Sequence, residues 1–207
     1  MPTYKLTYFN GKGRAELTRL LFTAADVEFT DHRIDYYTDW PEIKPHTPNN
    51  QLPVLEIDDK HQIPQSLSIA RYIAREYGLA GNGNLNQAYA DSIVETFDDL
   101  HVEFGKTLNE KDEKKKAELT LRFRKETLPR YLGNLEKALK RNNEGTGYFV
   151  GDSLTWADLQ AFHILDITLG DDDEILKQYP KLEGLRQRIE NLPRISIYLQ
   201  TRPQSKV

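Results

Sequence analysis

The chain has 207 residues, a formal net charge of −4 and no cysteine. This length can bury a substantial core without disulfides, and the mild acidity is unlike the basic face that nucleic-acid binding requires. The absence of cysteine excludes disulfides, thiolate metal sites and cysteine nucleophiles, so any thiol chemistry must use a thiol brought by a ligand. The N-terminus MPTYKLTYFN has no apolar signal region, and no apolar run approaches the ~18 residues of a membrane span, so we expect a cytoplasmic protein with no membrane partner.

The first 78 residues alternate strand and helix patterns. Alternating apolar residues predict a strand over 4–9, and leucines at helical spacing predict a helix over 14–25. Further strands are predicted at 28–34, 53–57 and 60–64, with a proline-containing loop after the first of these, and an amphipathic helix at 65–77. The order βαβ and then ββα predicts an α/β domain over residues 1–78.

The segment 78-GLAGNGN-84 indicates a linker, which we place at residues 79–85. Beyond it the strand signal largely disappears. Helical patterns at 85–106, 113–142, 155–169 and 180–191, with a short last helix near 194–200, predict an all-helical domain over residues 86–207. Thr155 and Asp158 have the spacing of a capping box, which fixes where the helix over 155–169 begins.

Three interpretations compete for the loop 11-GKGR-14. A dinucleotide fingerprint needs glycine at position 16, where the chain has Glu16, and a phosphate-binding P-loop needs Ser or Thr after Gly-Lys. The glycines can instead simply form the turn. In the third interpretation Tyr8, at the strand end, directs its hydroxyl over the N-terminus of the following helix, where the helix dipole and Arg14 create a positive field. Such a hydroxyl can donate a hydrogen bond to an anion, for instance a thiolate.

Other groups of the first domain suit a small ligand with separated carboxylates. Trp40 offers an indole donor, Lys44 an ammonium, and Ser66 a hydroxyl and a backbone amide at a helix N-terminus. A cis Leu52–Pro53 bond would turn the Leu52 backbone outward to pair with an extended peptide. The alternatives are a trans proline at a strand start and a plain N-cap for Ser66.

Glu95, Asp98 and Asp99 are spaced i, i+3 and i+4 and so share one face of a predicted helix. Three like charges there repel one another unless a cation meets them, and the candidates are Arg or Lys, a ligand amine, or magnesium or calcium. A solvated acidic face is the alternative. The five histidines are scattered and have no paired metal-ligand spacing.

Together these segments resemble the cytosolic glutathione transferases. The resemblance rests on the strand-end tyrosine, GKGRAE, the WPxxK segment, QLPVLE, QSLSIARY, the linker and GDSLTWADL of an all-helical domain, and it covers the whole chain. YKLTYFN, DHRI, DWPEIK and the closing RPQSKV are most similar to the sigma class, which includes a prostaglandin D synthase, invertebrate transferases and lens crystallins.

The resemblance implies a thioredoxin-like α/β domain that binds glutathione as co-substrate and a helical domain that forms the electrophile pocket. It implies that Tyr8 donates its hydroxyl to the glutathione sulfur and that Arg14 tunes this site. The other implied glutathione contacts are Trp40 and Lys44 at the glycine-end carboxylate, Leu52 before a cis Pro53 with Gln51 beside it at the cysteinyl part, Gln65 and Ser66 at the γ-glutamyl carboxylate, and Asp99 of a second subunit at the γ-glutamyl amine. A homodimer is therefore implied.

The resemblance also implies an electrophile pocket near Phe9, Gly13 and Phe104. Glu95, Asp98 and Asp99 resemble a cluster of that synthase that binds magnesium or calcium, but its first position is Asp where this chain has the longer Glu95. We expect conjugation of glutathione to small hydrophobic electrophiles. The alternatives are a glutathione-dependent prostaglandin isomerase and a crystallin-like structural or ligand-carrying protein. The synthase pattern has a tryptophan where this chain reads 104-FGKTL-108, and aromatic residues where Gln160 and Ala161 follow Leu159, so the isomerase is the less favoured expectation.

Overall fold

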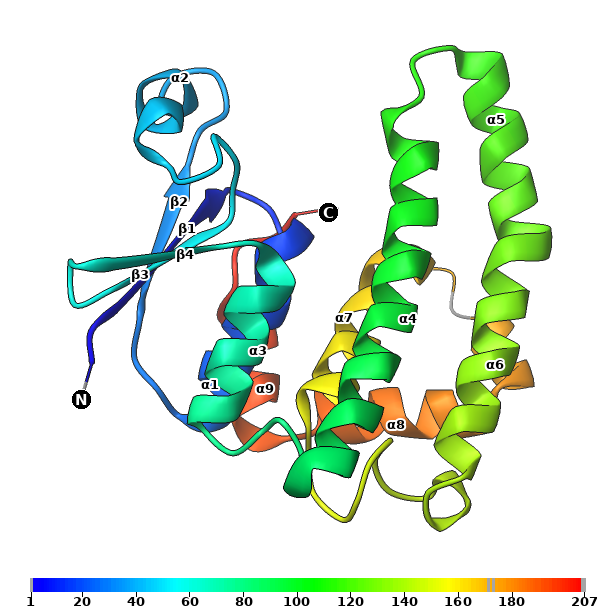
Figure 1. Cartoon of the computed structure of the whole chain (residues 1–207). Coiled ribbons are helices and arrows are strands. Elements are labelled where there is room, and N and C mark those ends of the chain that lie inside the picture. The colour runs from blue at the N-terminus through cyan, green and yellow to red at the C-terminus, as the bar shows by residue number, and fades with distance from the viewer. Residues whose placement is uncertain (1, 171, 173, 206–207) are drawn as a thin grey trace. The chain divides into compact units, whose positions relative to one another are not determined.

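The computed structural model describes residues 2–170, 172 and 174–205, so the end of the predicted domain 86–207 and the last two residues of RPQSKV lie outside the described residues (Figure 1). The chain forms two compact units. The first contains the chain up to Ala80 and the segment from Asn191 onward, and the second spans Gly81–Glu190. Within the described ranges, no helix is both long enough and apolar enough to cross a bilayer.

The first unit is built on a four-stranded sheet. Its strands are β1 (Tyr4–Phe9), β2 (Thr30–Ile34), β3 (Val54–Ile57) and β4 (His61–Pro64), in the order β2-β1-β3-β4. β1 is parallel to β2 and antiparallel to β3, which is antiparallel to β4. The parallel pair is joined by a helical crossover, as parallel strands require. The predicted βαβ-ββα order and the thioredoxin-like fold are confirmed.

Two helices of the first unit pack together beside the sheet (Figure 1). They are α1 (Glu16–Ala25), which follows a 3₁₀ turn at Gly13–Ala15, and α3 (Ser66–Glu76). The core between helices and sheet contains the fully buried Leu6, Leu20, Leu21, Phe22, Leu55, Ile69 and Ile73. Arg14 therefore lies in the 3₁₀ turn and not in the α-helix that we predicted from position 14.

The proline-containing loop holds a helix that the sequence did not predict. This is α2 (Trp40–Ile43), which continues into a 3₁₀ turn at Lys44–His46. Pro41 stands in the first turn of α2, where its missing N–H has no intrahelical partner to lose. A helix of four residues is too short to show a periodic pattern, so the sequence indicated only a loop.

The last helix, α9 (Pro193–Thr201), packs on α1 and belongs to the first compact unit, not to the helical one. Part of this contact is made by Glu16, which is 1% exposed, and part by Arg194, whose Nη2 donates to Asp26 Oδ2 at 2.7 Å. Glu16 Oε1 accepts hydrogen bonds from the Tyr198 hydroxyl at 3.0 Å and from Arg202 Nη1 at 2.7 Å. Because a buried carboxylate must be paired, Glu16 fixes the C-terminal segment on α1.

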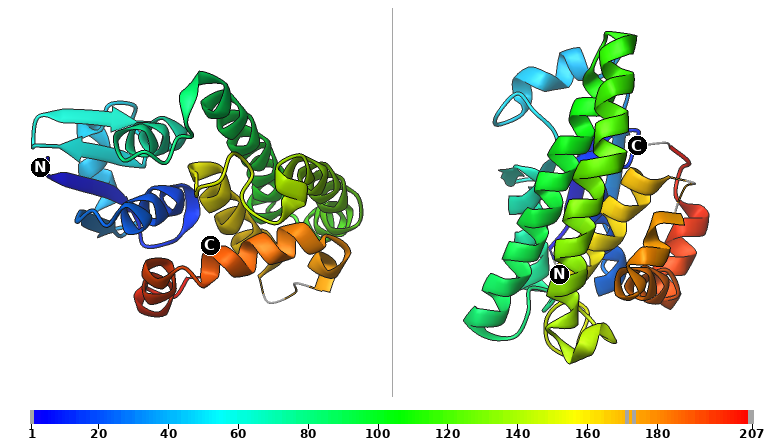
Figure 2. Two further views of the ribbon diagram at one scale, coloured as in Figure 1. Left: turned by 90° about the horizontal axis from the view of Figure 1, so that it is seen from below. Right: turned by 90° about the vertical axis from the view of Figure 1, so that its right-hand side faces the viewer.

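The second unit is helical. Its helices are α4 (Gly83–Asn109), α5 (Glu113–Arg122), α6 (Leu128–Lys140), α7 (Trp156–Leu169) and α8 (Pro180–Glu190), with 3₁₀ segments at Asn143–Gly145 and Glu174–Gln178. The predicted single helix over 113–142 is two helices joined by a π-helical segment, Phe123–Thr127. Pro129 has no N–H to donate to the carbonyl of Lys125, and this missing bond accounts for the irregular turn. Figure 2 shows α4 running beside the α5–α6 pair.

α7 is the central helix of the second unit, and almost all its residues are buried. It begins at the predicted capping box. The Asp158 carboxylate, which is 0% exposed, accepts the backbone N–H groups of Phe149 and Thr155, both at 2.8 Å, and the Thr155 hydroxyl at 2.9 Å. Despite these bonds, burial raises the pKa of the Asp158 carboxyl to about 6.

Candidate functional site

A cleft of about 520 Å³ in the first unit collects most of the residues expected to bind glutathione. Its lining consists of Phe9, Arg14, Tyr36, Trp40, Lys44, Asn49, Asn50, Gln51, Leu52, Pro53, Pro64, Gln65 and Ser66. The volume is in the range of small-ligand sites. The sequence reasoning did not identify Tyr36, Asn49, Asn50 or Pro64 as members of this set.

Tyr8 is the penultimate residue of β1 and lies beside this cleft, since its ring is 5.5 Å from that of the cleft residue Phe9. The Tyr8 hydroxyl oxygen accepts a hydrogen bond from the backbone N–H of Arg14 at 3.2 Å. This bond leaves the phenolic O–H free to donate elsewhere, and it polarises that O–H. The tyrosine hydroxyl therefore stands over the first helical turn after β1, in the geometry that the third interpretation of the loop requires.

Gly13 makes this close approach feasible. Its φ of +39° is in the left-handed region, and a Cβ at this position would lie 2.5 Å from the Tyr8 hydroxyl oxygen. No side chain larger than hydrogen fits there without moving the tyrosine. The glycine loop is thus a turn fitted to Tyr8, and the phosphate-binding interpretation is not needed to explain it.

Arg19 holds the same loop in place by hydrogen bonding, and the sequence analysis did not predict this role. Its side chain is fully buried, and Nη1 donates to the carbonyl oxygen of Gly11 at 2.7 Å. Its charge is balanced by Glu16 at 3.2 Å and Asp31 at 3.0 Å, and its guanidinium carbon lies 6.0 Å from the centroid of the Tyr8 ring. The available signal was an arginine inside the apolar run of a predicted helix, with acidic residues in reach.

The N-terminus of α3 also lines the cleft, through Gln65 and Ser66. Gln65, its N-cap, has φ +73° and ψ +115°, a strained conformation for a residue with a side chain, at a cost of about 1–3 kcal/mol. Such strain concentrates at functional sites. Ser66 begins the helix, so unpaired backbone N–H groups and the positive end of the helix dipole face an incoming ligand. The Leu52–Pro53 peptide bond, also in the lining, is cis as expected.

The charge of the cleft is one-sided. Among the described residues that line it, Arg14 and Lys44 are cationic and none carries a carboxylate. Together with the α3 N-terminus, these two groups place positive potential at separate points of one cleft. The arrangement suits an extended ligand with more than one negative group.

Six predicted site residues do not line this cleft, and two of them, Tyr8 and Gly13, belong to the first unit with it. Glu95, Asp98, Asp99 and Phe104 lie on α4 in the second unit, and the Phe104 ring packs 5.4 Å from that of Phe123. Over residues 2–170, 172 and 174–205, no group of three or more His, Asp or Glu side chains is arranged to hold a metal ion. The expected magnesium or calcium site on α4 therefore has no support.

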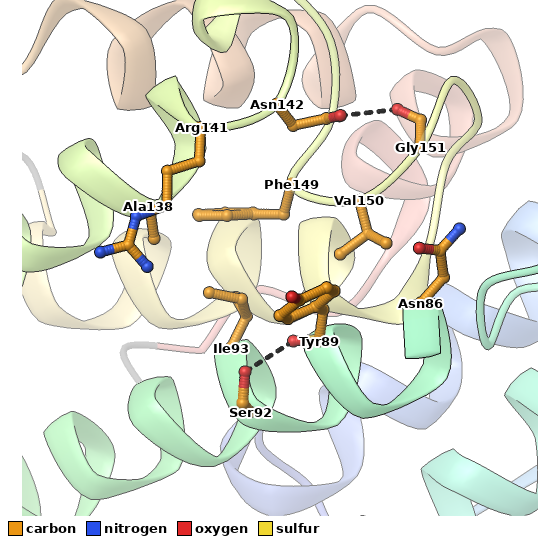
Figure 3. Close-up of a pocket in the computed structure, with 10 residues that line it drawn as sticks. All are labelled: Asn86, Tyr89, Ser92, Ile93, Ala138, Arg141, Asn142, Phe149, Val150 and Gly151. Atoms are coloured by element: carbon orange, nitrogen blue, oxygen red, sulfur yellow. Dashed lines mark hydrogen bonds between the residues drawn. The ribbon is translucent and has the colours of Figure 1, made fainter. Parts of the chain in front are cut away.

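A second cavity, of about 340 Å³, lies wholly within the helical unit (Figure 3). Tyr89 and Ile93 of α4 face Phe149 and Val150 across it, and Arg141 borders it. The cavity contains none of the predicted catalytic or glutathione-binding residues. The cleft of the first unit is therefore the candidate active site.

The first unit is a thioredoxin-like domain with a tyrosine near the end of its first strand, a cis-proline loop and a helix N-terminus in the cleft lining. The chain also contains an all-helical unit. Residues 4–75 match the family profile described as "Glutathione S-transferase, N-terminal domain", and residues 98–202 match "Glutathione S-transferase, C-terminal domain". The chain belongs to the glutathione S-transferase family.

Its relatives include a prostaglandin D synthase and S-crystallins. The chain is 42% identical to hematopoietic prostaglandin D synthase of Gallus gallus over 100% of both chains, and 40% identical to S-crystallin SL11 of Nototodarus sloanii over 98% of both. Among solved structures, rat hPGDS complexed with a quinoline matches with a TM-score of 0.89 and 35% identity, covering 99% of this chain and 100% of that one.

Proposed function

We propose that this chain is a sigma-class glutathione transferase that conjugates the glutathione thiolate to small hydrophobic electrophiles, and that Tyr8 stabilises the thiolate. The observation that carries the proposal is the Tyr8 hydroxyl, which accepts the Arg14 N–H and keeps its own proton for an anion beside a cationic cleft. A free thiol has a pKa of about 8.5, and a hydrogen bond to a charged group contributes roughly 1.5–3 kcal/mol, which lowers that pKa by about one to two units. The bound thiol would then be largely ionised at neutral pH.

The rest of the cleft holds the tripeptide. Lys44 and the Trp40 indole bind the glycine-end carboxylate, the Leu52 backbone pairs with the cysteinyl part with Gln51 beside it, and Gln65 and Ser66 bind the γ-glutamyl carboxylate. The positive charge of the lining and the N-terminus of α3 support this orientation. Binding both ends of glutathione fixes the sulfur beside Tyr8, and positioning of this kind accelerates a bimolecular reaction.

In the reaction the thiol proton leaves to solvent, the thiolate forms a carbon–sulfur bond, and the leaving group departs with its electron pair. Phe9 and Gly13 stand beside Tyr8, where an electrophile would meet the sulfur. The contribution of Phe104 stays a prediction, as do the cytoplasmic location and the homodimer in which Asp99 of one subunit meets the γ-glutamyl amine bound by the other. An Asp99→Asn substitution tests that role, since it should raise the KM for glutathione more than it lowers kcat.

The decisive test is conjugation of glutathione to 1-chloro-2,4-dinitrobenzene, with Tyr8→Phe as the variant and Tyr89→Phe, an exposed tyrosine of the helical unit, as the matched control. We expect Tyr8→Phe to keep its affinity for glutathione and to lose most of kcat, and the control to behave as wild type. Equal rates in wild type and Tyr8→Phe would refute the role of Tyr8.

Two further functions are suggested by the relatives. The synthase of Gallus gallus suggests a glutathione-dependent isomerase and S-crystallin SL11 a lens protein, and both are similar to this chain over nearly its whole length. Product analysis with prostaglandin H2 separates the first from the transferase. Binding of glutathione without turnover of any electrophile, in a folded protein, would favour the crystallin-like role.

A further inference from the structure

Glu16 connects the C-terminal segment to the active-site loop through its two carboxylate oxygens. Oε1 accepts the hydrogen bonds from Arg202 at 2.7 Å and from the Tyr198 hydroxyl at 3.0 Å that hold α9 beside α1 (Figure 1). Oε2 accepts a hydrogen bond from Arg19 Nη1 at 3.2 Å. The Glu16 side chain is 1% exposed and that of Arg202 is 12% exposed, so these charges interact more strongly than they would at the surface. One buried carboxylate thus serves an arginine of α1 and an arginine of the C-terminal segment.

Arg19 divides its hydrogen bonds between Glu16 and the glycine loop. The same nitrogen, Nη1, also donates to the carbonyl oxygens of Gly11 at 2.7 Å and of Lys12 at 3.4 Å. The bond to Gly11 is shorter than the bond to Glu16. A carboxylate normally attracts a guanidinium more strongly than a neutral carbonyl does. Glu16 leaves this nitrogen to the loop because a second cation, Arg202, balances its charge.

The loop that Arg19 holds sets the position of the Tyr8 hydroxyl. The two carbonyl groups bound by Arg19 lead directly into the 3₁₀ turn that begins at Gly13. The hydroxyl oxygen accepts the Arg14 N–H of this turn at 3.2 Å, and the turn passes so close to it that no Cβ fits at Gly13. A shift of the loop would therefore move the groups that fix and polarise the hydroxyl, and small misplacements of a reacting group can cost much of a rate.

We infer that Arg202 is a positioning residue of the conjugation reaction. Its charge balances Glu16, which leaves Arg19 bound to the glycine loop, and the loop then keeps the Tyr8 hydroxyl in place. The inference rests on the proposed function, because the hydroxyl matters only if it holds the thiolate. Without Arg202, both oxygens of Glu16 become available to Arg19, and a guanidinium binds a carboxylate best through two parallel bonds. Such a pair would draw Nη1 away from Gly11.

A second arginine of the C-terminal segment provides a matched comparison. Arg194 also ties α9 to α1, through its bond to Asp26. Asp26 is the C-cap of α1, at the helix end opposite Glu16, and this pair includes no atom of the glycine loop. The side chains of Arg194 and Asp26 are 57% and 68% exposed, and a surface ion pair of this kind contributes little. Removing Arg194 therefore loosens the same helix contact without changing the charge balance at Glu16.

The test measures the pKa of the bound glutathione thiol, from thiolate absorbance near 240 nm, together with kcat and the KM for glutathione in conjugation to 1-chloro-2,4-dinitrobenzene. The variants are Arg202→Ala, Arg202→Lys and Arg202→Met, with Arg194→Ala as the control. Lysine keeps a cation for Glu16, and methionine keeps an unbranched stem without the charge and replaces the alanine variant if that variant does not fold. Urea denaturation gives the stability of each protein.

We expect Arg202→Ala and Arg202→Met to raise the pKa of the bound thiol by about half to one unit, which is part of the one to two units assigned to the Tyr8 hydrogen bond. At pH 5.5 kcat should fall about three- to tenfold with the thiolate fraction, and at pH 9 the difference should shrink. The KM for glutathione should change less than about twofold. Arg202→Lys should restore most of kcat, and Arg194→Ala should behave as wild type.

A double mutant shows whether the effect passes through the tyrosine. In a Tyr8→Phe background Arg202→Ala should leave the pKa of the bound thiol where Tyr8→Phe alone puts it, because the group being positioned is already absent. An equal shift with and without the Tyr8 hydroxyl would overturn the inference. So would an equal shift in Arg194→Ala, or a loss of stability in Arg202→Ala with no change in this pKa. If wild type already leaves the bound thiol at its free pKa, the proposed function fails and the inference fails with it, whereas a lowered pKa that ignores Arg202 refutes the inference alone.

Discussion

Asp158 should make this protein more stable as the pH falls from 7.5 to 5, whereas most native carboxylates make a protein less stable when they are protonated. Burial raises the pKa of its carboxyl from the ordinary 3.8 to about 6, so the folded state holds the proton more tightly than the unfolded state. The stabilisation from this proton is fully present below the unfolded pKa of 3.8 and is lost as the pH rises through 6. A shift of about two pKa units corresponds to about 3 kcal/mol in total.

The change in the free energy of unfolding can be measured between pH 7.5 and pH 5. Over this interval the two pKa values give the wild type about 1.4 kcal/mol of additional stability from protonation of Asp158. Asp158→Asn has no carboxyl to titrate there. It also loses an acceptor for the N–H groups of Phe149 and Thr155, so we expect it to be less stable at both pH values. The stability gap between wild type and variant should therefore widen at pH 5.

The assay is urea denaturation at both pH values, followed by fluorescence of Trp156 in a Trp40→Phe background, so that the single remaining tryptophan reports on the helical unit. Asp59→Asn is the matched control, because Asp59 is an exposed turn residue at φ +54°, a conformation that asparagine tolerates. A gap that stays constant, or narrows, between pH 7.5 and pH 5 would refute the reasoning about Asp158.

Three further substitutions test the construction of the first unit. Gly13→Ala places a Cβ against the Tyr8 hydroxyl and displaces that group, so the conjugation rate should fall about ten- to hundredfold. An unchanged kcat would show that the loop accommodates the Cβ without moving Tyr8. Gln65→Gly relieves a strained backbone and should raise the free energy of unfolding by about 1 kcal/mol in denaturant titrations, while glutathione binding weakens in calorimetry. Glu16→Gln removes the more buried of the two carboxylates that balance Arg19 and leaves only Asp31, so it should cost about 3–5 kcal/mol of stability in the same titrations. A loss under about 1 kcal/mol would contradict the buried pairing.

Regular periodicity carried most of the fold prediction. The alternation in 4–9 and the leucines of 14–25 each reflect one buried face of an element, and those elements appear in the structure as β1 and α1. The apolar spacing over 113–142 predicts one continuous helix, because that spacing continues through the π-helical segment. The signal for an interruption was Pro129, which cannot donate the backbone hydrogen bond that a regular helix needs there. The placement of α9 depends on Glu16, which is 182 residues away from Tyr198 along the chain, and no local pattern encodes such a contact.

The site was predictable where its chemistry is local. Three of its features depend only on the local backbone conformation, namely the turn at Gly13, the cis Leu52–Pro53 bond and the start of α3 at Gln65 and Ser66. The residues that were missed act through partners brought close by the fold.

Arg19 is buried because Asp31 and Glu16 neutralise it. Tyr36 reaches Phe9 because β1 and β2 are parallel with Phe9 opposite Ile34, which brings position 36 to the same sheet edge. The register of that strand pair was the signal that could have identified Tyr36.

The central claim is that Tyr8 keeps the bound thiol ionised, and the most direct measurement is the pKa of glutathione bound to the protein. Thiolate absorbance near 240 nm, titrated against pH with wild type and with Tyr8→Phe at saturating glutathione, gives that pKa without any electrophile. In wild type the pKa of the bound thiol should lie about one to two units below the free value of about 8.5, and in Tyr8→Phe it should return towards the free value. The same pKa in both proteins would contradict it.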